Sequence, residues 1–383
     1  MHFIPLISSK KALATLCNEL TQCNWIALDT EFIREKTYFP RPCLIQVATP
    51  RSIACIDPLE LNSLSPLIEI FNQTTITKVF HSAYQDLELL YQLTGTLPKP
   101  VFDTQVAARM LGYTDQIGYG NLVQQLLGVT LDKSHTRTDW SIRPLSDAQL
   151  RYAADDVRYL CQLYTQLSHA LREKGHLDWV KEDCERLYQE SNFKACIDDA
   201  WMRVRGADRL KSRQLAVLSA LATWREQQAM AKNLPRRWLL SDPMLLTLVR
   251  NTPKDLEALA KIRGISAKLI RQHGEQLISN IDRGLKTPQE QWPHSRLQRP
   301  PGPEQEIQVD LLIILVRHYA LKQNLNPSIL TTRNQLVKLI MGESGVPVMQ
   351  GWRADIIGER LQTVLKEQAW IGLQQGNLIV EKR

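Results

Sequence analysis

Residues 24–49 read NWIALDTEFIREKTYFPRPCLIQVAT and place two acids among residues that otherwise favour strands. The apolar runs on either side of the turn-rich YFPRP predict two β-strands. Because strand side chains alternate between faces, Asp29 and Glu31 share one face and lie about 6.6 Å apart. Two carboxylates on a half-buried strand repel each other and lose hydration. Either the strand runs out into solvent at this point, or a divalent cation neutralises the pair.

The composition is that of a globular protein with more than one domain. The chain has 383 residues, of which 44% are hydrophobic, enough for two or three cores at roughly 150 residues each. Its most apolar run, LLIILV at 311–316, is far shorter than the ~20 residues of a membrane span. The seven cysteines include no C-x-x-C pair, which argues against disulfides and structural zinc. We therefore expect a soluble, cytoplasmic protein with reduced thiols and no membrane partner.

Charge is divided unevenly along the chain. Residues 1–200 hold 19 Lys+Arg and 24 Asp+Glu, a net charge of −5, whereas residues 201–383 hold 28 and 16, a net charge of +12. Residues 201–300 alone contain 19 basic and 8 acidic residues. Such a segment either binds a polyanion or forms a solvated basic face.

Strand patterns precede helix patterns in the first 200 residues. WIALDTEF, CLIQVAT and SIACID, between residues 25 and 57, predict an antiparallel meander, and KVFH at 78–81 predicts a further strand. A helix follows, with Ser82 and Gln85 spaced as a capping box. A long amphipathic helix begins at a second capping box, Ser146 with Gln149. This order predicts an α/β domain over residues 1–204.

Residues beyond 205 show helical patterns and no strand signals. The Pro-rich stretch 287–305 interrupts them and reads as a linker. The pattern Ala-x-x-x-Asn-Leu at 229–234 recurs 91 positions later, at 320–325, which predicts two related helical modules, at 205–286 and 306–383. The second module is less basic, with a net charge of +1 over residues 301–383.

Two further acids lie where a strand gives way to a helix, or in a helix that can face the strands. Asp86 follows KVFH near the start of its helix. Asp156 lies four residues after Tyr152, so both side chains share one flank of the long helix, roughly 6 Å apart along its axis. Taken alone, Tyr152 is better read as a core-edge aromatic and Asp156 as a solvated charge.

The acids and their neighbours resemble a known family when they are taken together. LDTEF at 28–32, His81 five residues before Asp86, and Tyr152 four residues before Asp156 resemble the tyrosine-containing subgroup of the DEDD exonucleases. The resemblance covers about 200 residues and implies a ribonuclease-H-like fold, a mixed sheet flanked by helices. The C-terminal part resembles the HRDC domain, through WRE at 224–226, NLPR at 233–236 and LAKIRGIS at 259–266. An exonuclease domain followed by two all-α HRDC-like domains is similar to the ribonuclease D family.

The resemblance also implies roles for the acids. Two Mg²⁺ or Mn²⁺ ions held by carboxylates activate water and shield the phosphate during phosphodiester hydrolysis. Asp29, Glu31 and Asp156 would hold the first ion. Asp29 would bridge to the second ion, which Asp86 would support. Tyr152 would orient the attacking water.

Five other residues are weaker candidates. His81 could touch the scissile phosphate, although a histidine that ends a strand is more often structural. Gln46 and Asp103 also match family positions, with supporting roles. Trp224 and Trp238 could stack on bases, but tryptophans at helical spacing are more often core residues, and we expect both in the core.

These expectations combine into a metal-dependent 3′→5′ exoribonuclease that releases nucleoside 5′-monophosphates. Its substrates would be structured RNAs such as tRNA precursors, held through their phosphates by the basic modules. No obligatory protein partner is inferred. Two alternatives stay open: a DNA 3′→5′ exonuclease of the proofreading or repair kind, since the metal chemistry does not distinguish the sugar, and a catalytically inactive nucleic-acid-binding scaffold.

Overall fold

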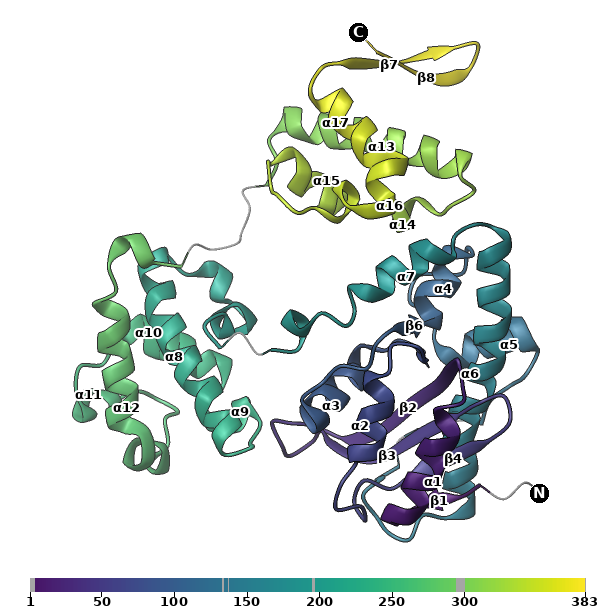
Figure 1. Cartoon of the computed structure of the whole chain (residues 1–383). Helices are drawn as coiled ribbons and strands as arrows, with labels where there is room; N and C mark the ends of the chain where they lie inside the picture. The colour runs from purple at the N-terminus through teal and green to yellow at the C-terminus, as the bar shows by residue number, and fades with distance from the viewer. Residues whose placement is uncertain (1–3, 133, 137, 195–196, 294–299, 383) are drawn as a thin grey trace. The chain divides into compact units, whose positions relative to one another are not determined.

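The computed structural model describes residues 4–132, 134–136, 138–194, 197–293 and 300–382, and Figure 1 shows their helices and strands. The chain divides into two compact units. The first comprises Met1–Glu31, Pro42–Glu190 and Pro300–Arg383, and the second comprises Phe32–Arg41 and Ser191–Arg299. The boundaries expected at residues 204, 286 and 305 stay predictions, and residues 294–299 of the expected linker lie outside the described residues.

A six-stranded sheet forms the centre of the first unit. Its strands lie in the order β1-β4-β3-β2-β5-β6. Strand β4 pairs parallel to β1 and antiparallel to β3, while β5 pairs parallel to both β2 and β6, so the sheet is mixed as expected. The antiparallel β3–β4 pair of the expected meander is confirmed. The strands are β1 (Leu6–Ile7), β2 (Trp25–Ile33), β3 (Arg41–Ala48), β4 (Ile53–Ile56), β5 (Thr77–Phe80) and β6 (Val101–Asp103).

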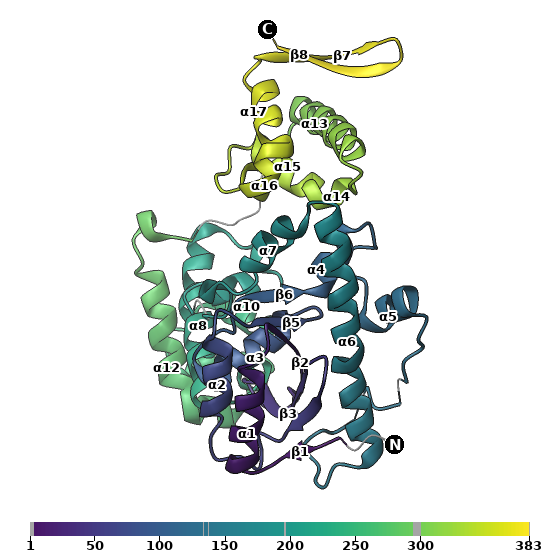
Figure 2. The ribbon, with the colours of Figure 1, turned by 45° about the vertical axis from the view of Figure 1, so that its right-hand side comes forward.

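Helices cover both faces of this sheet, with α1, α2 and α3 on one side of the strands and α6 on the other (Figure 2). Helix α6 has the expected capping box, in which the Ser146 hydroxyl accepts from the Gln149 N–H and the Gln149 side chain accepts from the Ser146 N–H. Its apolar flank, which includes Val157 and Leu160, is buried. The helices are α1 (Lys10–Leu20), α2 (Ser65–Asn72), α3 (Tyr84–Thr94), α4 (Thr104–Met110), α5 (Tyr119–Leu127), α6 (Asp147–Glu173) and α7 (Leu177–Glu185).

The capping box expected at Ser82 is wrong. Ser82 has a left-handed backbone, with φ of 59°, and α3 begins at Tyr84 without a side-chain cap. Instead, the carboxylate of Asp103 accepts hydrogen bonds from the Ser82 N–H at 3.0 Å and the Ala83 N–H at 2.9 Å. A carboxylate at the end of the neighbouring strand β6 therefore satisfies the N–H groups that precede α3.

Residues from 300 onward form a helical module within the first unit. Its long helix α13 (Pro303–Lys322) packs against α15 (Arg333–Ile340). The module also contacts α7, where the Arg353 guanidinium donates to both oxygens of Asp183 and the Trp352 ring stacks on Trp179 with centroids 4.7 Å apart. Trp352 and Arg353 are buried, so the buried guanidinium is paired. The shorter helices are α14 (Pro327–Leu330), α16 (Gly351–Arg353) and α17 (Glu359–Leu365).

A β-hairpin lies at the C-terminal end of this module and contradicts the expectation of an all-α segment beyond residue 205. Strand β7 (Ala369–Gln374) pairs antiparallel with β8 (Asn377–Lys382). The connecting Gln375 and Gly376 have φ of 50° and 78°, as a type I′ turn requires. Gln-Gly is a weaker signal for this turn than Asn-Gly or Asp-Gly, so the sequence pattern does not reveal the hairpin.

The second unit is a helical module that also contains the loop Phe32–Arg41. The Tyr38 hydroxyl of this loop donates to the carboxylate of Glu226 at 2.5 Å. The side-chain oxygen of Asn233 accepts from the backbone N–H groups of Tyr38 and Phe39, both at 3.1 Å. The helices of the module are α8 (Ser212–Ala231), α9 (Arg236–Leu239), α10 (Asp242–Asn251), α11 (Leu256–Ala260) and α12 (Ala267–Leu285). The loop that follows the acidic strand thus packs with helices distant in sequence.

The two helical modules share one turn, which supports the repeat seen in the sequence. Asn233 and Asn324 both have left-handed backbones, with φ of 47° and 52°. The leucine after each asparagine donates its N–H, at 2.9 Å, to the carbonyl of the alanine five residues earlier. A short helix follows in each copy, and then Ser241 caps α10 and Thr332 caps α15. The same sequence of caps and turns therefore occurs twice.

Two global expectations can be compared with the described residues. Within the ranges that the structure covers, no helix is both long enough and apolar enough to cross a membrane. None of the six cysteines in these ranges forms a disulfide, and they are Cys17, Cys23, Cys43, Cys55, Cys161 and Cys184. The seventh, Cys196, lies outside the described residues.

Candidate active site

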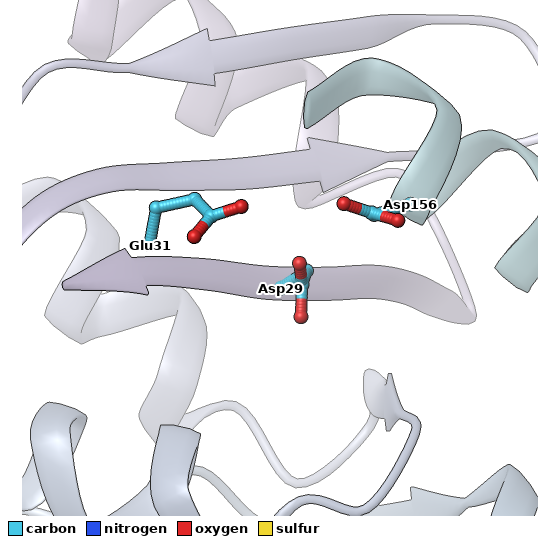
Figure 3. A group of neighbouring side chains, drawn as sticks. All are labelled: Asp29, Glu31 and Asp156. Atoms are coloured by element: carbon cyan, nitrogen blue, oxygen red, sulfur yellow. The ribbon is translucent and has the colours of Figure 1, made fainter. Parts of the chain in front are cut away.

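Three of the predicted acids converge between strand β2 and helix α6. Asp29 and Glu31 lie on β2, and Asp156 lies on α6. One oxygen from each carboxylate lies within 4.8 Å of those from the other two. Figure 3 shows the carboxylates of Glu31 and Asp156 pointing toward each other, with Asp29 projecting from the strand beside them. The structure thus brings together residues that are 125 positions apart in the sequence.

The electrostatics of this cluster call for a cation. Burial raises the pKa of Asp29 to about 6. Burial is the largest cause, and repulsion from Asp29 the next, of the raised pKa of Glu31, about 9, and of Asp156, about 8. Ionising all three carboxylates without a cation costs free energy, because they are buried and repel one another. Together they offer only oxygen ligands, which suits Mg²⁺ or Mn²⁺. The residues present therefore fit a hard divalent cation.

Asp86 lies near the cluster but outside the group of three converging acids. It is buried in the first turn of α3, and its carboxylate accepts a hydrogen bond of 2.5 Å from the hydroxyl of Thr30. Burial and the charge of Asp29 raise the pKa of Asp86 well above its usual value. Thr30 lies between the two acids of β2, so one strand presents Asp29 and Glu31 and also positions the acid of the opposing helix.

Tyr152 lies one helical turn before Asp156, and a loop encloses its side chain. Its ring contacts His135 and Trp140, with centroids 5.8 and 6.0 Å away, and its hydroxyl is hydrogen-bonded to the side chain of Thr136. Burial raises the pKa of Tyr152, and the charge of Asp156 adds to this effect. The phenol therefore stays protonated at neutral pH.

An ion pair between half-buried Arg143 and buried Asp57 anchors the loop that holds Tyr152. The Arg143 guanidinium donates to both carboxylate oxygens of Asp57, at 2.6 and 2.8 Å, and to the backbone carbonyl of Cys43 at 2.7 Å. Such a two-point contact fixes orientation as well as distance. Arg143, His135 and Thr136 are absent from the sequence-based candidates because no spacing pattern marks a residue whose partner lies in a loop.

The ring nitrogens of His81 are both used within the protein. Nδ1 lies 2.9 Å from the Thr104 hydroxyl and Nε2 lies 3.0 Å from the Ile117 carbonyl. A carbonyl only accepts, so Nε2 carries the proton. Burial lowers the pKa of His81, which favours this neutral form. The geometry is that of a structural histidine, and a contact between His81 and substrate stays a prediction.

The supporting candidates have distinct surroundings. Asp103 holds the turn before α3, and its carboxylate also accepts from the Gln105 N–H at 2.7 Å, at the start of α4. Gln46 on β3 is fully buried, and neither polar atom of its side chain has a hydrogen-bond partner among the described residues. Asp103 thus has a structural task in the position of α3, while the task of Gln46 stays a prediction.

The two tryptophans expected in the core behave differently. Trp224 is buried, and its ring N–H donates to the side chain of Gln276 at 2.9 Å, as expected for a core residue. Trp238 is 62% exposed, so its assignment to the core is wrong. It lies in α9, a helix of four residues none of which is buried, and two of them are Arg236 and Arg237. An exposed indole beside two guanidinium groups is a surface on which a nucleobase can stack.

Comparison with known proteins identifies the parts of the chain. Residues 4–172 match the 3′-5′ exonuclease family, and residues 214–281 match the HRDC domain. A ribonuclease D of Sphingobium indicum is 37% identical over 383 aligned residues, which cover 99% of this chain and 98% of that protein. A ribonuclease D of Pseudomonas paraeruginosa is 36% identical and covers 95% of this chain and 98% of its own length.

A solved structure agrees with these relatives. The crystal structure of Escherichia coli RNase D, described as an exoribonuclease involved in structured RNA processing, superposes with a TM-score of 0.86 at 32% identity. The match covers 96% of this chain and 99% of that one. The converging acids, the ribonuclease-H-like exonuclease domain and the full-length similarity lead to one conclusion: this chain belongs to the ribonuclease D family and is a 3′-5′ exoribonuclease.

Proposed function

We propose that Asp29, Glu31, Asp86 and Asp156 hold two Mg²⁺ or Mn²⁺ ions, and that the enzyme trims the 3′ ends of structured RNA such as tRNA precursors. The observation that carries the metal assignment is the convergence of three carboxylates within 4.8 Å, with pKa values raised by burial and mutual repulsion. Asp29, Glu31 and Asp156 are assigned to the first ion. Asp29 would also contact the second ion, with Asp86 in support.

When bound, the cations would activate the attacking water and shield the charge on the scissile phosphate. The Tyr152 hydroxyl would donate a hydrogen bond that orients this water, because the raised pKa of Tyr152 keeps the phenol protonated. Thr30 would keep the Asp86 carboxylate in one orientation through its hydrogen bond. The loop anchored by Arg143 would hold the Tyr152 ring in place. The products would be nucleoside 5′-monophosphates.

The basic first module supplies a place for the body of the RNA. Residues 201–300 carry 19 basic and 8 acidic residues, and phosphate contacts from Lys and Arg dominate affinity for RNA. Trp238, exposed beside Arg236 and Arg237, adds a stacking surface for an unpaired base. We further propose that residues 306–383 form a second HRDC-like domain, since the module repeats the turn and caps of the first.

We place the reaction in the cytoplasm. The six described cysteines form no disulfide, as is usual for proteins of reducing compartments. The exonuclease reaction needs no second protein in this proposal, because all the proposed ligands and Tyr152 come from one chain.

One experiment tests the metal assignment and the substrate class together. The full-length enzyme, with Mn²⁺ or EDTA, is incubated with a labelled tRNA precursor, an unstructured RNA and a single-stranded DNA. We expect metal-dependent release of mononucleotides, fastest from the tRNA precursor. A preference for the DNA would contradict the proposed substrate.

The matched variants are Asp29→Asn and Asp147→Asn. The first removes a proposed ligand and should abolish turnover while RNA binding, measured by fluorescence anisotropy, is retained. The second removes an exposed carboxylate from the first turn of the same helix that carries Asp156, and should leave turnover within a few-fold of the parent. An Asp29→Asn enzyme that keeps its rate would overturn the metal assignment.

A further inference from the structure

A cavity of about 880 Å³ lies at the start of strand β2, beside the turn between β3 and β4 and the middle of helix α6. Its volume falls within the roughly 300–1,000 Å³ that is usual for small-molecule sites. Every residue that lines it belongs to the first unit. The described residues that line it include neither Tyr152 nor any of the four acids assigned to the cations. The cavity is therefore distinct from the active site.

The cavity shares its strand and its helix with the active site. Trp25 lines the cavity and lies four residues before Asp29 on β2, hence on the same face of the strand and about 13 Å away. On α6 the lining residues run from Arg158 to Gln166, in the direction that leads away from Asp156. A ligand in the cavity would thus contact the two elements that carry these acids without contacting the acids.

The charge of the cavity favours an anion. Residues 1–200 carry a net charge of −5, yet the described residues that line the cavity include the guanidinium groups of Arg51 and Arg158 and no carboxylate. Arg51 is exposed and forms no ion pair among the described residues. Arg158 pairs with Asp155 through one nitrogen, and a guanidinium has further N–H donors. Guanidinium groups suit a phosphate, which each can contact at two points.

Helix α6 adds neutral hydrogen-bonding groups to the same wall of the cavity. Arg158, Gln162 and Gln166 are spaced four residues apart, so their side chains share one flank of the helix. They extend over about 12 Å along its axis. Gln162 and Gln166 are exposed, and their amide groups both donate and accept hydrogen bonds, as the edge of a nucleobase requires. The wall therefore presents two amides in line with a guanidinium.

Trp25 supplies an aromatic surface to the cavity. Its side chain is half-buried, and its ring packs against that of Tyr164 with centroids 4.7 Å apart. This contact holds the indole in place at the wall of the cavity, which Ile4 and Ile53 also line. A nucleobase stacks on an indole held in this way. The cavity thus combines a stacking surface, amides and two cations.

We propose that this cavity binds a nucleoside 5′-monophosphate. Arg51 and Arg158 bind the phosphate, Trp25 stacks on the base, and the two glutamines of α6 hydrogen-bond to the base or the ribose. A ligand of this size in such a site has a dissociation constant of roughly 10–100 µM. Mononucleotides are also the product class of the proposed reaction, but the site depends only on the groups that line the cavity.

The test is equilibrium dialysis of the full-length protein against radiolabelled 5′-AMP in EDTA, which removes the divalent ions through which the active site would hold a phosphate. We expect saturable binding of about one AMP per chain. Asp29→Asn should bind AMP as the parent does, because Asp29 does not line the cavity. Binding therefore reports on the cavity whether or not the metal assignment of the active site is correct. Adenosine and inorganic phosphate should each compete at least about tenfold less well than AMP, because each offers only part of the ligand.

Matched variants locate the phosphate and the cavity. Arg51→Gln removes a cation and should weaken AMP binding about tenfold, at the low end for a hydrogen bond to a charged group because Arg51 is exposed. Arg172→Gln is the control, since it removes an exposed arginine from the last turn of α6, outside the cavity. Thr165→Trp places a large ring at the wall of the cavity and should abolish binding, and the fold should survive because Thr165 is exposed. Thr165→Ser should bind as the parent does.

Photo-crosslinking with 8-azido-AMP, followed by mass spectrometry, identifies the residues in contact. The expected crosslinks fall on Trp25 or on residues 158–166. Absence of AMP binding up to about 1 mM, or binding that Arg51→Gln and Thr165→Trp leave unchanged, would overturn the proposal. Competition by inorganic phosphate as strong as that by AMP, or a crosslink confined to Tyr152, would overturn it as well.

Discussion

Replacing Thr30 with valine tests whether the hydrogen bond to Asp86 prepares the metal site. Valine has nearly the same shape as threonine but lacks the hydroxyl that donates to Asp86 at 2.5 Å. Both side chains are buried, with 7% exposure each, so water cannot easily replace the lost donor. Thr30→Val should therefore remove the hydroxyl donor to the Asp86 carboxylate and raise the pKa of Asp86 further.

The size of the effect follows from the charge of the acceptor. A hydrogen bond to a charged group contributes about 1.5–3 kcal/mol. If ionised Asp86 supports a cation, this loss corresponds to a roughly 10- to 150-fold weaker affinity for that ion. Loss of an orienting hydrogen bond behind a metal ligand typically costs about 10- to 100-fold, which agrees with this range.

The assay is a Mn²⁺ titration followed by electron paramagnetic resonance, with turnover of a short RNA measured at each concentration. Thr30→Val should shift the weaker of the two binding steps to higher Mn²⁺ concentration, and saturating Mn²⁺ should recover much of the rate. Thr30→Ser keeps a hydroxyl and should behave as the parent. Thr223→Val removes a hydroxyl that bonds the Ile197 carbonyl in the helical module, and controls for loss of a threonine elsewhere. An unchanged Mn²⁺ affinity in Thr30→Val would refute the reasoning.

Three further predictions concern the site and the RNA surface. Tyr152→Phe should lower kcat by about 100-fold without weakening Mn²⁺ binding, and a single-turnover assay that shows an unchanged rate would contradict the role given to the phenol. Burial raises the pKa of Glu31 to about 9, so in the metal-free protein the bound proton of Glu31 stabilises the fold, and this stability is lost as the pH rises from the ordinary glutamate pKa toward 9. The Tm in EDTA should therefore fall from pH 6 to pH 9, and Mn²⁺ should raise the Tm more at pH 9 than at pH 6. Equal increases in Tm at both pH values would argue against a protonated cluster. Trp238→Ala should weaken RNA binding by about tenfold in fluorescence anisotropy, whereas Trp370→Ala, a control tryptophan 45% exposed on β7, should not; equal losses would exclude a specific stacking contact.

The features that sequence reasoning anticipates are those set by local geometry. Asp29 and Glu31 alternate on a strand, and Ser146 and Gln149 form a capping box, because strand and helix periods fix these relations within a few residues. The antiparallel β3–β4 pair and the repeated Asn-Leu turn follow from similarly short patterns, whereas the mixed sheet is expected from the family resemblance. Family resemblance then adds the long-range statement that Asp156 meets the acids of β2.

The features that the sequence does not predict depend on contacts between residues distant in sequence. The partner of Thr30 lies 56 residues away on α3, and the cap of the α3 turn comes from Asp103 rather than Ser82. The repeat of a helix or strand pattern does not indicate which loop contacts Tyr152. The exposure of Trp238 escapes for a different reason: the expectation treats it as a core tryptophan at helical spacing, whereas its helix is only four residues long and has no buried residue.

Residues of the first 204 positions form contacts with helical residues later in the chain, and truncation would remove these contacts. Asn233 satisfies two backbone N–H groups of the loop that continues from β2, and Arg353 neutralises Asp183 on α7. An isolated fragment ending near residue 204 would keep every acid of the site, yet it would leave Tyr38 without its acceptor and Asp183 and the Trp179 ring uncovered. Its activity would therefore measure a perturbed active-site scaffold as well as the loss of RNA-binding surface. Point substitutions in the intact chain can separate the effect on the active site from the effect on RNA binding, whereas an isolated exonuclease fragment cannot.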